Sequence, residues 1–149
     1  NNWLSANKIA VNIFKTKYIF FSHCNQFQLP PISIGNGITE PTNCTKFLGI
    51  HIDQNLKFIN HIDYLASKIA KTVGFLYRLS RVLPSCVLRT LYFSLLHPYL
   101  SYGLETWYTA PKVHINRLLV LQKKGIRAIN KLPYNEHTST YFAANKILK

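Results

Sequence analysis

Cationic side chains are the residues of this chain most able to take part in chemistry. The sequence contains 18 Lys and Arg but only 5 Asp and Glu, and its formal net charge is +13. Such an imbalance creates a long-range field that attracts polyanions. The cations are spread along the whole chain, whereas lipid-binding segments usually carry a compact basic patch. Nucleic acid is therefore the favoured partner, and an anionic membrane surface ranks second.

Carboxylates and thiols offer little for metal chemistry. Asp53 and Asp63 are the only Asp residues, so the paired carboxylates of a two-metal site are missing. We predict structural roles for both, Asp53 at a strand end and Asp63 near the positive N-terminus of a helix. Cys24, Cys44 and Cys86 are widely spaced and form no Cys-x-x-Cys pair. We predict reduced thiols and no metal site.

The first third of the chain has the composition of short strands. Residues 1–9 resemble the end of a helix, and residues 10–21 are rich in β-branched and aromatic side chains, which predicts a strand broken near Lys15. Gly35-Asn36-Gly37 predicts a turn, so residues 32–38 should form a hairpin. Residues 47–52 should form the next strand.

After Leu56 the apolar period changes to three and four residues, which predicts helices. The first should bury Ile62, Leu65, Ile69, Val73 and Leu76 on one side. A second should begin near Pro84 and be interrupted at Pro98, a third should run from Pro111 to Pro133, and a last one should cover residues 138–148.

Two helical faces carry the strongest candidates for phosphate contact, because few carboxylates are present to balance them. The first helix places basic and aromatic residues on a stripe away from its apolar side: Lys57, His61, Tyr64, Lys68, Lys71, Phe75 and Arg78. The third helix directs Arg117, Lys124, Arg127 and Lys131 outward, and inward Ile115, Leu118, Leu119, Ile126 and Ile129.

Several motifs occur in a fixed order along the chain. Asn12, Lys15 and Thr16 form an Asn-x-x-Lys-Thr pattern, and Phe47-Leu48-Gly49 follows. Further on come residues 96–103 (LHPYLSYG), Trp107 and residues 121–127 (LQKKGIR). In this order they resemble the end of the palm and the thumb of reverse transcriptases from non-LTR retrotransposons of the LINE and jockey-like type.

The resemblance implies an RNA-directed DNA polymerase that uses magnesium and deoxynucleoside triphosphates, with an RNA template and a DNA primer as partners. Lys15 would lie near the incoming triphosphate and could protonate or screen the leaving pyrophosphate. Phe47, Leu48 and Gly49 would grip the primer end. The Tyr-x-Asp-Asp turn that should precede these motifs is absent, so we expect this chain alone to be inactive and to hold no cofactor.

The expected fold is α+β, with small antiparallel hairpins followed by an all-helical bundle. We assign residues 1–56 to the C-terminal end of a palm and residues 57–149 to a thumb-like domain. The first residue is Asn and no Met occurs. Together with the missing motif, this suggests a fragment whose fingers and remaining palm lie upstream, in an intracellular protein of the nucleus or cytoplasm.

The alternative is a stand-alone basic nucleic-acid-binding domain without polymerase ancestry. It predicts that residues 1–56 form a closed sheet, whereas the polymerase hypothesis predicts an open sheet edge with exposed apolar side chains. A peripheral membrane protein is a weaker third possibility. No stretch reaches the roughly 20 apolar residues of a membrane span.

Overall fold

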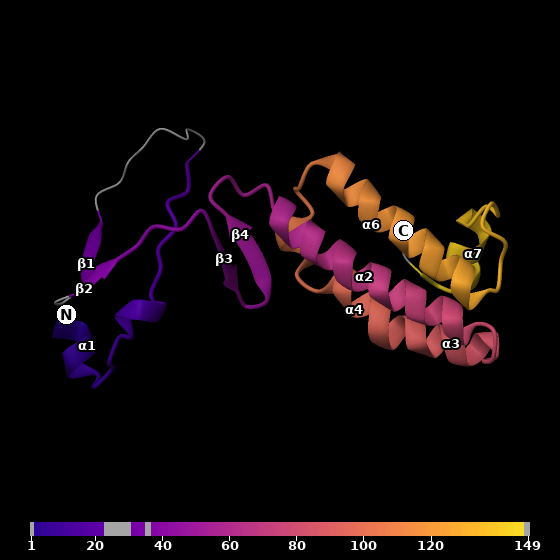
Figure 1. Ribbon diagram of the computed structural model, residues 1–149, viewed down its shortest axis with the longest axis horizontal. Helices are drawn as coiled ribbons and strands as arrows, with labels where there is room; N and C mark the ends of the chain where they lie inside the picture. Colours follow the sequence, from indigo (N-terminus) through magenta and orange to yellow (C-terminus); the bar gives the residue numbers. More distant parts are fainter. Residues whose placement is uncertain (1, 23–30, 35–36, 148–149) are drawn as a thin grey trace. The chain divides into compact units, whose positions relative to one another are not determined.

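The computed structural model describes residues 2–22, 31–34 and 37–147. The chain divides into two compact units, Asn1–Phe58 and Ile59–Lys149. Short helices and antiparallel strands make up the first unit, and helices make up the second (Figure 1). The expected α+β fold class is confirmed. The division falls two residues after the boundary expected from the sequence, and the assignment of the units to palm and thumb stays a prediction.

Two separate hairpins form the strands of the first unit. Strand β1 (Ile32–Ile34) pairs antiparallel with β2 (Gly37–Thr39), and β3 (Cys44–Phe47) pairs antiparallel with β4 (Ile50–Asp53). The hairpin expected at residues 32–38 is therefore confirmed. The single strand expected at residues 47–52 is wrong, because a turn at residues 48–49 divides it into the end of β3 and most of β4.

The strand predicted for residues 10–21 is also wrong. After helix α1 (Asn2–Ala6) the chain forms a short 3-10 helix, η1 (Ile13–Lys15), and then an isolated bridge between Tyr18 and Pro41. The reason is local, because the Asn12 side chain accepts a hydrogen bond from the backbone of Lys15 and stabilises a turn that competes with a strand.

The second unit is built on two long helices that lie side by side, α2 (Ile59–Leu79) and α6 (Lys112–Ile129) (Figure 1). Both run in the same direction, because Asp63 near the start of α2 meets Arg117 near the start of α6. The connection between them returns through four shorter segments, and one more helix follows α6. These are α3 (Ser85–Leu91), the π-helical segment η2 (Tyr92–Leu96), α4 (His97–Ser101), α5 (Leu104–Trp107) and α7 (Ser139–Ala144).

The apolar side predicted for α2 is confirmed, since all five of its residues are buried. Leu118, Ile126 and Ile129 of α6 are buried as expected, while Ile115 and Leu119 are half-buried. Buried apolar side chains from the connection complete the core: Leu88, Tyr92, Leu96 and Trp107.

The interruption at Pro98 takes the form of a π-helical segment immediately before the proline. Proline cannot donate the backbone hydrogen bond that an α-helix requires, and π turns are one way in which a helix adapts to such a loss. The chain resumes as α4 with Pro98 in its first turn.

Gly125 lets α6 approach this segment closely. A methyl group at Gly125 would lie 2.9 Å from Cδ1 of Leu96, which is fully buried. One turn away, the amide of Gln122 donates to the hydroxyl of Tyr92 at 3.3 Å. Burial raises the pKa of Tyr92, with the Gln122 hydrogen bond acting in the opposite direction.

Candidate nucleic-acid interface

The Asn12-x-x-Lys15-Thr16 pattern is one connected turn. The backbone N–H of Lys15 donates to Oδ1 of Asn12 at 3.3 Å, and the Thr16 hydroxyl donates to the Asn12 carbonyl at 2.9 Å. Ile13 in the middle of the turn packs on β2, where a methyl group at Gly37 would lie 2.6 Å from it. The motif thus anchors a turn whose lysine, Lys15, is exposed.

Phe47, Leu48 and Gly49 form the tip of the β3–β4 hairpin. Phe47 pairs with Ile50, and Leu48 and Gly49 are the two turn residues, with φ of 45° and 86°. Two positive φ values are what a type I′ turn requires, and Asn or Gly is normally preferred for both. A leucine in the first position is strained, because its side chain disfavours positive φ. Leu48 is nevertheless 74% exposed, and the neighbouring Phe47 is 61% exposed. Gly49 is thus the second residue of the turn.

Asp53 fixes the loop that follows the hairpin. Its carboxylate accepts hydrogen bonds from the backbone of Lys57 at 3.0 Å and of Phe58 at 2.6 Å. The structural role predicted for Asp53 at a strand end is confirmed. Lys57 is exposed in this loop, ahead of the helix whose stripe it was expected to join.

On α2 the predicted stripe is only partly formed. Lys68, Lys71 and Arg78 are exposed, and the ammonium of Lys68 lies 5.6 Å from the ring centre of Tyr64. Phe75 is also exposed on this helix.

His61 is the error in the predicted stripe, because it is buried. Its ring centre lies 6.4 Å from that of Tyr64 and 6.0 Å from that of Trp107. The sequence did not reveal α5, which brings Trp107 over this side of α2 and excludes His61 from solvent.

The cations expected on α6 have different surroundings. Arg117 forms an ion pair with Asp63, so the structure uses that carboxylate to join two helices. The guanidinium of Arg127 lies 5.9 Å from the ring centre of Tyr134, and its Nε donates to the Glu136 carbonyl at 3.0 Å. Lys131 is exposed just beyond the helix end.

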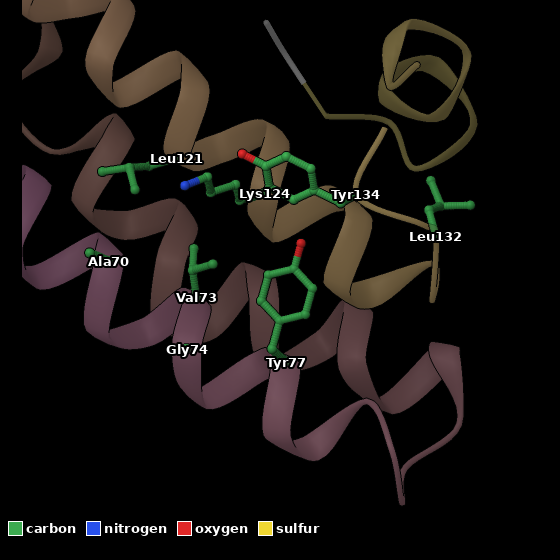
Figure 2. A pocket seen from close by; sticks show the side chains of 8 residues that line it. All are labelled: Ala70, Val73, Gly74, Tyr77, Leu121, Lys124, Leu132 and Tyr134. Carbon is green, nitrogen blue, oxygen red and sulfur yellow. The ribbon is translucent and has the colours of Figure 1, made fainter. Parts of the chain in front are cut away.

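A surface pocket of about 370 Å³ lies between α2, α6 and the segment after α6 (Figure 2). Lys124 is the one predicted contact residue in its lining. Tyr77 and Tyr134, which the sequence did not single out, form part of the same lining. Tyr77 and Tyr134 come together only because α2 packs beside α6, and no periodic spacing in the sequence indicates that they share a pocket. The full lining is Ala70, Val73, Gly74, Tyr77, Leu121, Lys124, Leu132 and Tyr134.

Within the described ranges, no group of three or more His, Cys, Asp or Glu side chains is arranged to hold a metal ion. Cys44 and Cys86 are free thiols, while His23 and Cys24 lie outside the described residues. In the same ranges no helix has the length and apolar character needed to cross a membrane.

Comparison with known proteins found related sequences among mobile elements. The chain is 26% identical over 140 residues to the RNA-directed DNA polymerase from mobile element jockey of Drosophila melanogaster, a match that covers 91% of this chain and 15% of that protein. It is 29% identical over 133 residues to a probable RNA-directed DNA polymerase from transposon X-element of the same species, covering 87% and 14% of the two chains. It is 30% identical over 107 residues to the probable RNA-directed DNA polymerase from transposon BS of D. melanogaster, and this match covers 70% of this chain and 12% of that protein.

No protein-family model matches the chain, and no solved structure matches it significantly. The chain spans only 12% to 15% of the length of these three relatives. The matched region nevertheless includes most of this sequence in each case. The chain is thus a distant relative of the reverse transcriptases of non-LTR retrotransposons.

Proposed function

We propose that the chain is a part of an RNA-directed DNA polymerase of a non-LTR retrotransposon, and that it holds primer and template during DNA synthesis. The observation that carries the proposal is the similarity to the jockey polymerase over 91% of this chain. The ordered motifs lie within a chain of the expected architecture, with hairpins first and a helical unit after them.

The β3–β4 hairpin is the proposed primer grip. Its tip presents Phe47 and the strained Leu48 to solvent, where neither contributes to a core. Strain and apolar exposure are both unfavourable for folding alone, and such features tend to persist where a surface binds something. A tight two-residue turn would hold these side chains in a fixed direction against the primer end.

The helical unit is the proposed clamp for the RNA/DNA hybrid. Lys68, Lys71, Arg78 and Lys131 are exposed, and among the described residues none of them is paired with a carboxylate. Unpaired cations release counterions when they meet a phosphate backbone, which supplies most of the affinity for nucleic acid. These four cations, three on α2 and one just after the end of α6, therefore form the proposed phosphate-contacting surface.

Nucleotide addition is not proposed for this chain alone. Magnesium would be held by paired Asp carboxylates, but Asp53 accepts two backbone N–H groups and Asp63 pairs with Arg117. These residues do not fit a two-metal site, so no catalytic step is assigned through them. In an intact polymerase the exposed Lys15 would protonate or screen the leaving pyrophosphate, as the resemblance implies.

The test is the affinity of the purified chain for a recessed-end RNA/DNA hybrid, a blunt hybrid and a single strand over a salt series. We expect preference for the recessed end. Changing Lys68, Lys71 and Arg78 to Gln should lower the salt dependence of log K by about 0.9 for each phosphate that the variant no longer neutralises.

The grip is tested by Leu48→Asn, with Leu56→Asn as the matched control. Leu56 is also an exposed leucine with positive φ, 52°, but it lies outside the hairpin. Leu48→Asn should lower affinity for the recessed end about tenfold, and Leu56→Asn should leave it unchanged. Equal affinity for all three nucleic acids would instead favour a stand-alone basic domain.

A further inference from the structure

The pocket between α2 and α6 combines an apolar floor with two tyrosines and a lysine. Ala70, Val73 and Leu121 are small or apolar, and at Gly74 an added methyl group would meet no atom within 4 Å. The glycine therefore leaves open space where any other residue of the helix would place a side chain. The volume of about 370 Å³ lies at the lower end of the roughly 300 to 1,000 Å³ typical of small-ligand sites.

The aromatic walls of this pocket come from different elements. Tyr77 extends from α2 toward Tyr134, which belongs to the segment after α6 (Figure 2). Burial raises the pKa of Tyr77, with Arg127 lowering it and Tyr134 raising it, so these three groups share one neighbourhood. Tyr134 is 71% exposed, which leaves much of its ring free to meet a planar ligand.

Two cations are placed beside these rings. Lys124 is half-buried in the pocket lining, and no carboxylate pairs with it among the described residues. The Arg127 guanidinium is held 5.9 Å from the Tyr134 ring centre by that ring and by a hydrogen bond from its Nε to the Glu136 carbonyl. A planar ring with an attached anion would complement this arrangement of tyrosines and cations.

We propose that the pocket binds one unpaired nucleotide of a single-stranded nucleic acid. The base lies against Tyr77 and Tyr134, and its phosphate meets Lys124 and Arg127. A paired base cannot enter, because its faces are stacked within the duplex, so the pocket distinguishes a single strand from the hybrid held elsewhere on the unit. This inference rests on the proposed function and adds to it a site for one nucleotide outside the hybrid.

The test uses a short abasic DNA strand carrying a single thymine, compared with the same strand wholly abasic, so that one base is isolated. The full chain should bind the thymine strand about tenfold more tightly, because the isolated base can stack on aromatic side chains of the pocket. Gly74→Leu fills the pocket from a position with open space and should abolish the preference. Tyr134→Ala should do the same, while Tyr108→Ala, at a tyrosine of similar exposure (67%) outside the pocket, should not.

Thermal unfolding of each variant verifies that it is folded, and affinity for the recessed hybrid is measured in parallel. Unchanged hybrid binding with loss of the thymine preference in Gly74→Leu and Tyr134→Ala supports the pocket. If the hybrid is bound but the thymine preference is absent, or survives both variants, the pocket proposal is overturned and the proposed function stands. Failure to bind any nucleic acid would overturn both.

Discussion

The two units differ in how far their apolar side chains are buried from solvent. In Ile59–Lys149 the helices α2, α6 and the connection between them enclose a core that includes Ile62, Ile69, Leu76 and Tyr92. Among the side chains of Asn1–Phe58 that the structure describes, Phe58 is the one buried apolar residue. Several large apolar residues of that unit are exposed instead: Trp3, Ile9, Phe20, Phe21, Ile32, Ile38, Phe47, Leu48 and Leu56.

The contrast shows that apolar residues alone do not give a segment a core of its own, because both units contain many of them and only the helical unit buries them extensively. Two-stranded hairpins are at best marginal in water, because each strand has one unpaired edge and too little apolar surface is buried. The closed sheet expected of a stand-alone domain is not seen in the described residues, which hold two separate hairpins. The described hairpins of the first unit are separate, and many of its apolar side chains are exposed. These are the features that the polymerase hypothesis predicts, and they support the polymerase proposal.

The largest effect is expected from separating the two units. Residues 59–149 should keep a cooperative unfolding transition, because nearly all the described buried apolar side chains lie there, whereas residues 1–58 should show none. Urea unfolding followed by far-ultraviolet circular dichroism measures both. A sigmoidal transition in the isolated 1–58 segment would show that this segment has a stable core of its own and that the two units do not differ in this way.

Within the helical unit, a cavity at its centre should be the next most damaging change. Ile69 is fully buried on α2, and Ile69→Ala should lower the free energy of unfolding by about 2 to 5 kcal/mol. Val82→Ala, at an exposed position after α2, is the control and should change it by less than about 0.5 kcal/mol. Equal effects of the two changes in chemical denaturation would mean that Ile69 does not lie in the core.

The two glycines of the long helices should respond in opposite directions. Gly125→Ala would press on the buried Leu96, and roughly 1 to 3 kcal/mol of overpacking should outweigh about 1 kcal/mol of helix propensity. Gly74→Ala meets open space and should raise the free energy of unfolding by about 0.5 to 1 kcal/mol. Midpoints of urea unfolding distinguish the two, and a stabilising Gly125→Ala would contradict the close approach of α6 to η2.

The smallest effect is expected at the Arg117–Asp63 ion pair. Both side chains are about half exposed, at 58% and 49%, so solvent screens the attraction. Arg117→Ala should cost about 0.2 to 1 kcal/mol of stability, and less in high salt. The comparison with Asp63→Asn and with the double variant isolates the coupling of the pair, which should be near zero at high ionic strength.

Patterns carried by one element could be predicted from the sequence. The apolar side of α2 and the hairpin at residues 32–38 follow from spacing and turn residues, and both are present. The α+β class followed from the change of period after Leu56. Such features depend on neighbours along the chain, and the sequence records those directly.

Features that depend on distant partners could not be predicted in this way. His61 is periodic with the exposed stripe, yet Trp107 of α5 covers it. The strand predicted at residues 10–21 failed for a different, local reason: the composition favoured a strand, but the Lys15 backbone N–H donates to the Asn12 side chain and stabilises a turn there. Tyr77 and Tyr134 are far apart in the sequence, so the pocket that they share forms only when α2 packs against α6.

The excess of cationic over acidic side chains also governs how copies of this protein behave toward one another in solution. With a net charge of +13, and with Arg117–Asp63 as the one ion pair among the described residues, the molecules repel each other at low ionic strength. That repulsion offsets the tendency of exposed residues such as Phe47 and Ile38 to associate. At 1 M salt the screening length falls to about 3 Å, and the colloidal stability of the preparation should collapse before its fold does.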